Sequence, residues 1–198
     1  MTGRILRALA IAALIHPSSA LAADKQVRVY LGSTFGGATT FVDLEHAVGK
    51  PNAVVGAAVV TLGDMFGVDL DVADAPGFFQ AGDEHLVLSS RVTTLTGNFV
   101  IAAPRRWTEY TFRPYLVSGA GLMRVRFDDY FGALKVSSVL PAWDVGGGAI
   151  AFVTNQVGVS WEVRRFQSLS RQTTERGVTF GEEKLSFWRA SVALAIRY

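Results

Sequence analysis

The sequence of 198 residues contains no cysteine and only three histidines. The absence of cysteine excludes disulfide bonds, thiol catalysis and cysteine-based metal sites. Only His46 and His85 lie beyond the first 22 residues, and two dispersed histidines are a weak signal for a metal site. We therefore expect neither a metal ion nor a cofactor.

The chain also lacks a run of about 18 apolar residues, which excludes a membrane-spanning helix. Its start instead has the three parts of a secretory signal: Arg4 and Arg7, an apolar stretch over Ala8–Ile15, and an A-x-A site at Ala20–Ala22. The apolar stretch is shorter than the roughly 20 residues of a membrane anchor. We therefore predict a cleaved signal peptide over residues 1–22 and one exported domain over residues 23–198.

The exported domain has no excess of charge of either sign. Residues 1–22 hold two of the 19 basic residues and none of the 17 acidic ones, which leaves 19 − 2 = 17 basic against 17 acidic residues. Without a basic excess the sequence gives no reason to expect nucleic acid as a partner.

Apolar and polar residues alternate in eight segments, a pattern typical of β-strands that bury one face. The eight segments are Val27–Phe35, Val54–Leu62, Phe66–Val72, Val92–Ala102, Tyr115–Phe127, Trp143–Val153, Val157–Phe166 and Ser186–Tyr198.

Long and short connections alternate between these segments. The short ones are Gly63–Met65, Ala103–Pro114 and Thr154–Gln156; the long ones are Gly36–Ala53, Ala73–Arg91, Asp128–Ala142 and Gln167–Leu185. In an even number of antiparallel strands, this alternation places the four long loops at one end and both termini at the other.

Four stretches carry a resemblance to a known family: RVYLGSTFGG, RPYLVSGAGLMR, VGGGAIAF followed by TNQ and VGVSWEV, and the terminal SVALAIRY. They resemble the small eight-stranded outer-membrane β-barrels and are similar to the membrane domain of outer-membrane protein A and to outer-membrane protein X. The resemblance implies an all-β fold, an eight-stranded antiparallel up-and-down transmembrane β-barrel. It also implies a non-enzymatic structural or interaction role in the outer membrane, with four extracellular loops.

The same resemblance implies three partners: membrane lipid, lipopolysaccharide and the barrel-assembly machinery. In such families the machinery reads a last strand that ends in an aromatic residue with apolar residues at alternate positions before it. The residues of this signal here are Tyr198, Ile196, Leu194 and Val192.

Aromatic residues frame two of the predicted strands. Trp188 and Tyr198 are ten residues apart, about 33 Å at roughly 3.3 Å per residue. A tilt of about 40° reduces this to the roughly 25 Å height of the apolar band between two aromatic girdles. Tyr115 and Phe127 frame the fifth predicted strand similarly, so we predict all four in the girdles.

The faces opposite the apolar ones carry charges that a narrow barrel would enclose. Enclosed charges must be paired, so we predict an ion-pair network with a basic excess in the lumen. Its members are Asp69, Asp71 and Glu162 with Arg28, Arg124, Arg126, Arg164 and Arg189. Pairing Phe166 with Ser186 in the last hairpin places Glu162 opposite Ala190.

Two alternatives remain open. A soluble exported barrel has the same alternation with its apolar face inward, and would bind an apolar ligand. A lipid A-modifying enzyme needs a histidine near a serine or an acid. His85 beside Glu84 meets this only within a predicted loop, and no histidine accompanies Ser160 in the seventh segment. We expect no catalytic residue, and the sequence identifies no ligand for the extracellular loops.

Overall fold

The computed structural model describes residues 24–39, 51–78, 87–108, 112–129, 135–169, 174–175, 178–179 and 184–198. The predicted signal peptide over residues 1–22 lies outside these residues, and so do His46 and His85. No helix in the described part of the chain is long and apolar enough to cross a membrane.

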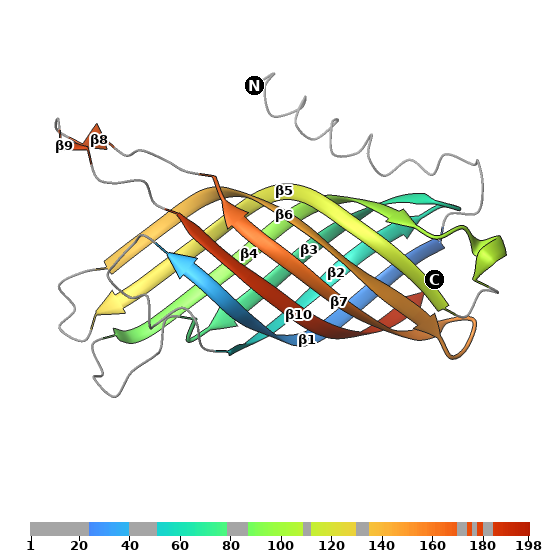
Figure 1. The fold of residues 1–198 in the computed structure, drawn as a ribbon. Helices are drawn as coiled ribbons and strands as arrows, with labels where there is room; N and C mark the ends of the chain where they lie inside the picture. Colours follow the sequence, from blue (N-terminus) through green and yellow to red (C-terminus); the bar gives the residue numbers. More distant parts are fainter. Residues whose placement is uncertain are drawn as a thin grey trace, which may run out of the picture.

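Eight antiparallel strands close into a barrel (Figure 1). They are β1 (Asp24–Thr39), β2 (Asn52–Leu62), β3 (Phe66–Pro76), β4 (Val87–Ala102), β5 (Phe112–Asp129), β6 (Lys135–Phe152), β7 (Val157–Ser168) and β10 (Leu185–Arg197). Each strand pairs with its neighbour in sequence, and β10 closes the barrel on β1. The predicted all-β, eight-stranded up-and-down barrel is confirmed.

The barrel has two distinct ends. β1 begins beside the end of β10, where the Tyr198 N–H donates to the Lys25 carbonyl at 3.1 Å. The connections 63–65, 103–111 and 153–156 lie at this end, which we call the terminal end. The short 3₁₀ helix η1 (Arg105–Trp107) belongs to the second of them. The other four connections lie at the opposite end, which we call the loop end.

The predicted alternation of loop lengths is only partly correct. Strand β5 continues to Asp129 and β6 begins at Lys135, so most of the predicted loop Asp128–Ala142 is strand. The connection between β7 and β10 also contains a second, two-stranded sheet that was not predicted, formed by β8 (Thr174–Glu175) and β9 (Val178–Thr179). Alternation in sequence could not mark these strand ends, because they extend past the segments with a clear apolar face.

The predicted register of the last hairpin is wrong by one residue. Phe187 lies opposite Phe166, so Glu162 lies opposite Ser191 rather than Ala190. A shift of one residue would turn one strand's side chains to the other face relative to its partner. The observed register keeps both phenylalanines inside the barrel, where their rings stack with centroids 5.2 Å apart.

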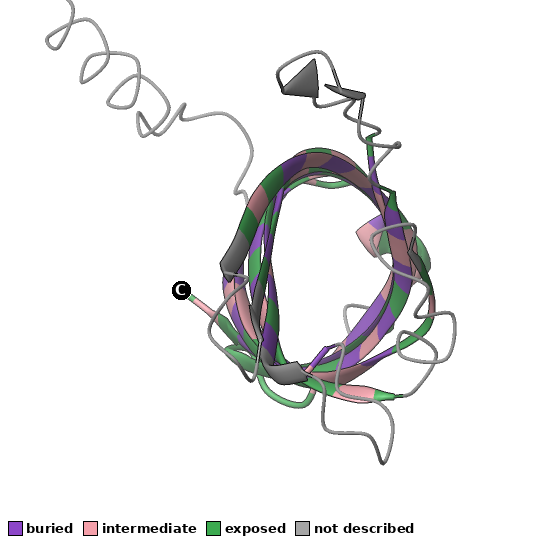
Figure 2. Cartoon of the chain, turned by 90° about the vertical axis from the view of Figure 1, so that its left-hand side faces the viewer, coloured by how far each residue is buried: buried purple, intermediate pink, exposed green. Residues whose placement is uncertain are grey.

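Buried and exposed residues alternate along the strands (Figure 2). The alternation is most regular in β7. Side chains fill the inside of the ring in two buried apolar clusters. One lies in the loop-end half and includes Phe78, Phe166 and Phe187. The other lies in the terminal-end half and includes Leu62 and Ile150. Charged residues occupy the space between the two clusters.

Candidate functional site

Arg164 on β7 is the centre of the charged layer in the lumen, and its side chain is 1% exposed. Its guanidinium donates to Asp69 Oδ2 on β3 at 2.7 Å and to Asp144 Oδ2 on β6 at 3.3 Å. It also pairs with Glu162 on its own strand, where Nη2 donates to Oε2 at 2.9 Å. Three strands are therefore joined through one buried cation.

Arg189 on β10 forms the second centre. Its Nη1 donates to Asp71 Oδ1 at 2.9 Å and to the Tyr30 hydroxyl at 2.8 Å, and its Nη2 lies 3.7 Å from Glu162 Oε1. The Tyr30 hydroxyl donates in turn to Asp71 Oδ2 at 2.8 Å. Because Glu162 faces both Arg164 and Arg189, the two centres form one continuous network.

The network extends to Tyr115, which was predicted in an aromatic girdle. That prediction is wrong, because Tyr115 is buried in the lumen. Its hydroxyl donates to Glu162 Oε2 at 2.8 Å and accepts from Arg28 Nη1 at 3.0 Å. The Arg28 guanidinium also lies 4.9 Å from the centre of the Tyr115 ring.

Arg124 and Arg126 were predicted in the lumen. That prediction is wrong, because both lie on the outer face of β5. Both are exposed, whereas Val125 between them and Met123 before them are buried. Strand β5 has apolar residues on both faces, so alternation alone could not tell which face turns inward. Tyr115 was misplaced for the same reason, since it shares a face with Met123 and Val125.

These corrections reverse the charge balance of the lumen. Sequence reasoning missed Asp144 and included two arginines that point outward. Among the described residues the layer contains four carboxylates and three guanidinium groups: Asp69, Asp71, Asp144, Glu162, Arg28, Arg164 and Arg189. The predicted basic excess is therefore absent. Asp144 lies between the apolar residues Trp143 and Val145, and this local alternation was the signal that could have identified it.

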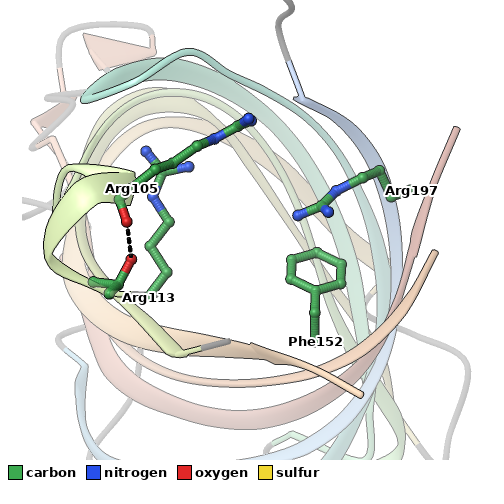
Figure 3. Close-up of a pocket in the computed structure, with 5 residues that line it drawn as sticks. Arg105, Arg113, Phe152 and Arg197 are labelled. Carbon is green, nitrogen blue, oxygen red and sulfur yellow. Dashed lines mark hydrogen bonds between the residues drawn. The ribbon is translucent and has the colours of Figure 1, made fainter. Parts of the chain in front are cut away.

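A second group of charges surrounds the terminal end of the barrel, where a small cavity of about 30 Å³ lies (Figure 3). Arg105 and Arg197 extend toward each other, and Asp24 pairs with both. The guanidinium carbon of Arg197 also lies 3.7 Å from the centre of the Phe152 ring. Arg113 donates to the carbonyls of the neighbouring turns. These contacts tie the first strand, the last strand and two turns together.

The predicted assembly-signal residues share the outer face of β10 and its end. Val192, Leu194 and Ile196 are all exposed, as is Tyr198 directly after the strand. Trp188 lies on the same face, and the guanidinium carbon of Arg165 lies 5.8 Å from the centre of its ring. The side chain of Phe127 lies outside the described residues.

The buried network is suited to holding strands together rather than to reacting. Its cations are arginines, which stay protonated and cannot accept a proton. In the described part of the chain no group of three or more histidine, aspartate or glutamate residues is arranged to hold a metal ion. Ser160 on β7, the serine considered above as a catalytic residue, is buried.

Comparison with known proteins identifies both sequence and structural similarity. Residues 8–194 match the family model described as the outer membrane protein beta-barrel domain. No curated protein sequence matches the chain. The crystal structure of Neisserial surface protein A is similar with a TM-score of 0.62 and 10% identity, over 88% of this chain and 97% of that one.

Two further solved structures have the same architecture. OprG from Pseudomonas aeruginosa has a TM-score of 0.59 and 13% identity, over 90% of this chain and 97% of that one. Ail from Yersinia pestis, in complex with the heparin analogue sucrose octasulfate, has a TM-score of 0.51 and 14% identity, over 89% of this chain and 100% of that one. At these identities the likeness shows a common fold.

Proposed function

This chain belongs to the outer membrane protein β-barrel domain family, and from that premise we propose that it is a non-enzymatic barrel with a closed lumen. The protein is located in the outer membrane of a Gram-negative cell, surrounded by membrane lipid and lipopolysaccharide. This location excludes the alternative of a soluble exported barrel.

The filled interior carries the proposal. A layer of paired charges lies between two apolar clusters, one toward each end of the barrel. An eight-stranded barrel is just wide enough for its interior to be filled by side chains. A solute would have to displace both the ion pairs and the stacked phenylalanines Phe166 and Phe187.

The role we propose is to hold the connections of the loop end outside the cell. The terminal end would face the periplasm, because barrels of this kind have short periplasmic turns. Residues 1–22 would be removed as a signal peptide, and the mature chain would begin at Ala23. The outer face of β10, ending in Tyr198, would be the signal for the barrel-assembly machinery.

Two measurements test the proposal, one on purified protein and one on cells. In planar lipid bilayers, the folded protein should produce no steady conductance, and stable open channels would contradict the closed lumen. Lipid A from cells with and without the protein should have identical masses. A change in its acyl chains would show the lipid A-modifying enzyme instead.

A further inference from the structure

Three arginines lie together on the outer face of two neighbouring strands. Arg91 on β4 is directly opposite Arg126 on β5, and Arg124 is two residues before Arg126 on the same face. All three side chains are exposed. We call Arg91, Arg124 and Arg126 the outer arginine cluster.

The cluster begins where the apolar outer surface ends. The last apolar pair on these strands is Leu95 and Leu122, which are opposite each other and exposed. Arg124 and Arg126 follow Leu122 by two and four residues, about 7 and 13 Å along a strand. With a tilt of about 40° this becomes roughly 5 and 10 Å along the membrane normal, the depth of the headgroup region.

Among the ion pairs of the described residues, the cluster has one carboxylate for three guanidinium groups. Like charges directly opposite each other on adjacent strands destabilise the pair. This carboxylate is Asp74 on β3, which pairs with Arg91 at 3.5 Å and accepts from the Thr93 hydroxyl at 2.8 Å. In the part of the chain that the structure describes, neither Arg124 nor Arg126 forms an ion pair.

We propose that the outer arginine cluster binds the phosphate groups of a lipopolysaccharide molecule in the outer leaflet. Guanidinium groups bind phosphate oxygens in pairs of charge-assisted hydrogen bonds, and a bound dianion would remove the repulsion between Arg91 and Arg126. This inference rests on the proposed orientation, in which the loop end faces outward and the cluster lies in the outer leaflet.

The surface below the cluster favours a lipid over a free anion. Leu95, Phe99, Leu116 and Leu122 are exposed on the same two strands, directly toward the membrane interior. A ligand with phosphate at one end and acyl chains at the other would contact both parts. Lipopolysaccharide has this arrangement, because its lipid A disaccharide carries phosphates above the acyl chains.

Arg165 on β7 provides a matched control. It is exposed on the outer face and follows the apolar residue Val163, as Arg124 follows Leu122. It lies opposite Trp188 and Val145 rather than another arginine, and its guanidinium lies over the Trp188 ring. Replacing it removes one outward cation without touching the cluster.

The test is binding of diphosphorylated lipid A to the full-length mature protein in neutral detergent, measured by native mass spectrometry. Arg126→Gln should weaken binding roughly fivefold and Arg124→Gln with Arg126→Gln roughly thirtyfold, if each cation contributes as it does near an anionic surface. Arg165→Gln should leave the affinity within about twofold, because a specific site does not depend on distant charge. The difference in gel mobility between boiled and unboiled protein verifies that each variant is folded.

Three outcomes would overturn the inference: an equal loss with Arg165→Gln, no loss with the double variant, or equal binding of dephosphorylated lipid A. Competition by inorganic phosphate at the concentration of the lipid would indicate a free-anion site and would overturn the lipid assignment. Failure of the proposed function is separate, since it would be detected as conductance or as an altered lipid A mass.

Discussion

Tyr115 on β5 donates a hydrogen bond of 2.8 Å to Glu162 on β7, across the intervening strand β6. The residue of β6 between them is Gly148, which lies opposite both. A Cβ atom at Gly148 would lie 2.2 Å from the Trp161 carbonyl oxygen of β7 and 3.0 Å from the Tyr115 hydroxyl. Glycine at this position therefore avoids a clash with the β7 backbone and also leaves room for the Tyr115 hydroxyl.

A related arrangement joins β1 and β3, although Gly56 of β2 lies opposite Tyr30 and Ala73 rather than opposite Asp71. Tyr30 on β1 reaches over Gly56 on β2 to Asp71 on β3, at 2.8 Å. In both cases a tyrosine hydroxyl links a carboxylate to an arginine from another strand, Arg28 or Arg189. Glycine in these strands thus makes room for the buried network.

Tyr115→Phe should destabilise the barrel by roughly 1–3 kcal/mol, because it removes the acceptor of Arg28 Nη1 and one of the two donors to Glu162 Oε2 in a buried layer. Urea unfolding in lipid vesicles, followed by tryptophan fluorescence, measures this change. Tyr198→Phe removes the same hydroxyl from an exposed position and should change stability by less than about 0.5 kcal/mol. Equal effects at the two sites would contradict the bridging role of Tyr115.

Gly56→Ala should cost roughly 1–3 kcal/mol, because a Cβ atom there overlaps the Tyr30 ring and a backbone carbonyl, that of Val72. The matched control is Gly97→Ala in β4, where a Cβ atom has no neighbour within 4 Å. Unfolding curves of the two variants should separate clearly. If Gly97→Ala is as destabilising as Gly56→Ala, space for Tyr30 is not the reason for the glycine.

Val159→Arg should destabilise the barrel by roughly 2–4 kcal/mol, since it places a cation on the lipid face near the midplane. Gln156→Arg, in the exposed turn before the same strand, should cost no more than about 1 kcal/mol. Folding free energies in vesicles give both values.

Spin labels add an independent measurement: a label at Val163 should be relaxed by oxygen in the lipid, and a label at Ser160 should be protected. The reverse pattern of accessibility would mean that the outward and inward faces have been exchanged.

Tyr198→Asp should sharply lower the amount of assembled barrel in the outer membrane, because it puts a charge at the interfacial end of the proposed assembly signal. Tyr198→Phe keeps an aromatic ring there and should assemble normally. Quantitative blots of the heat-modifiable band measure both variants. Normal assembly of Tyr198→Asp would show that the machinery does not depend on this residue.

The alternation of apolar and polar residues predicted the eight strands. Each predicted segment lies within an observed strand or extends one residue past its end. The closing strand was evident because its outer face is apolar from Val192 to Ile196. Alternation in sequence reflects local burial. A strand with one apolar and one polar face can therefore be recognised from its sequence. The members of the charged layer on β3, β7 and β10 were predicted on this basis.

Strand β5 needed the tertiary structure. A period of two separates its residues into two sets but does not say which set faces inward, and both sets contain apolar residues such as Leu122 and Met123. The choice is made by contacts with strands distant in sequence, where Tyr115 meets Glu162. Alternation in sequence therefore determined the barrel, while pairing across strands determined which arginines are enclosed in the lumen and which face the lipid.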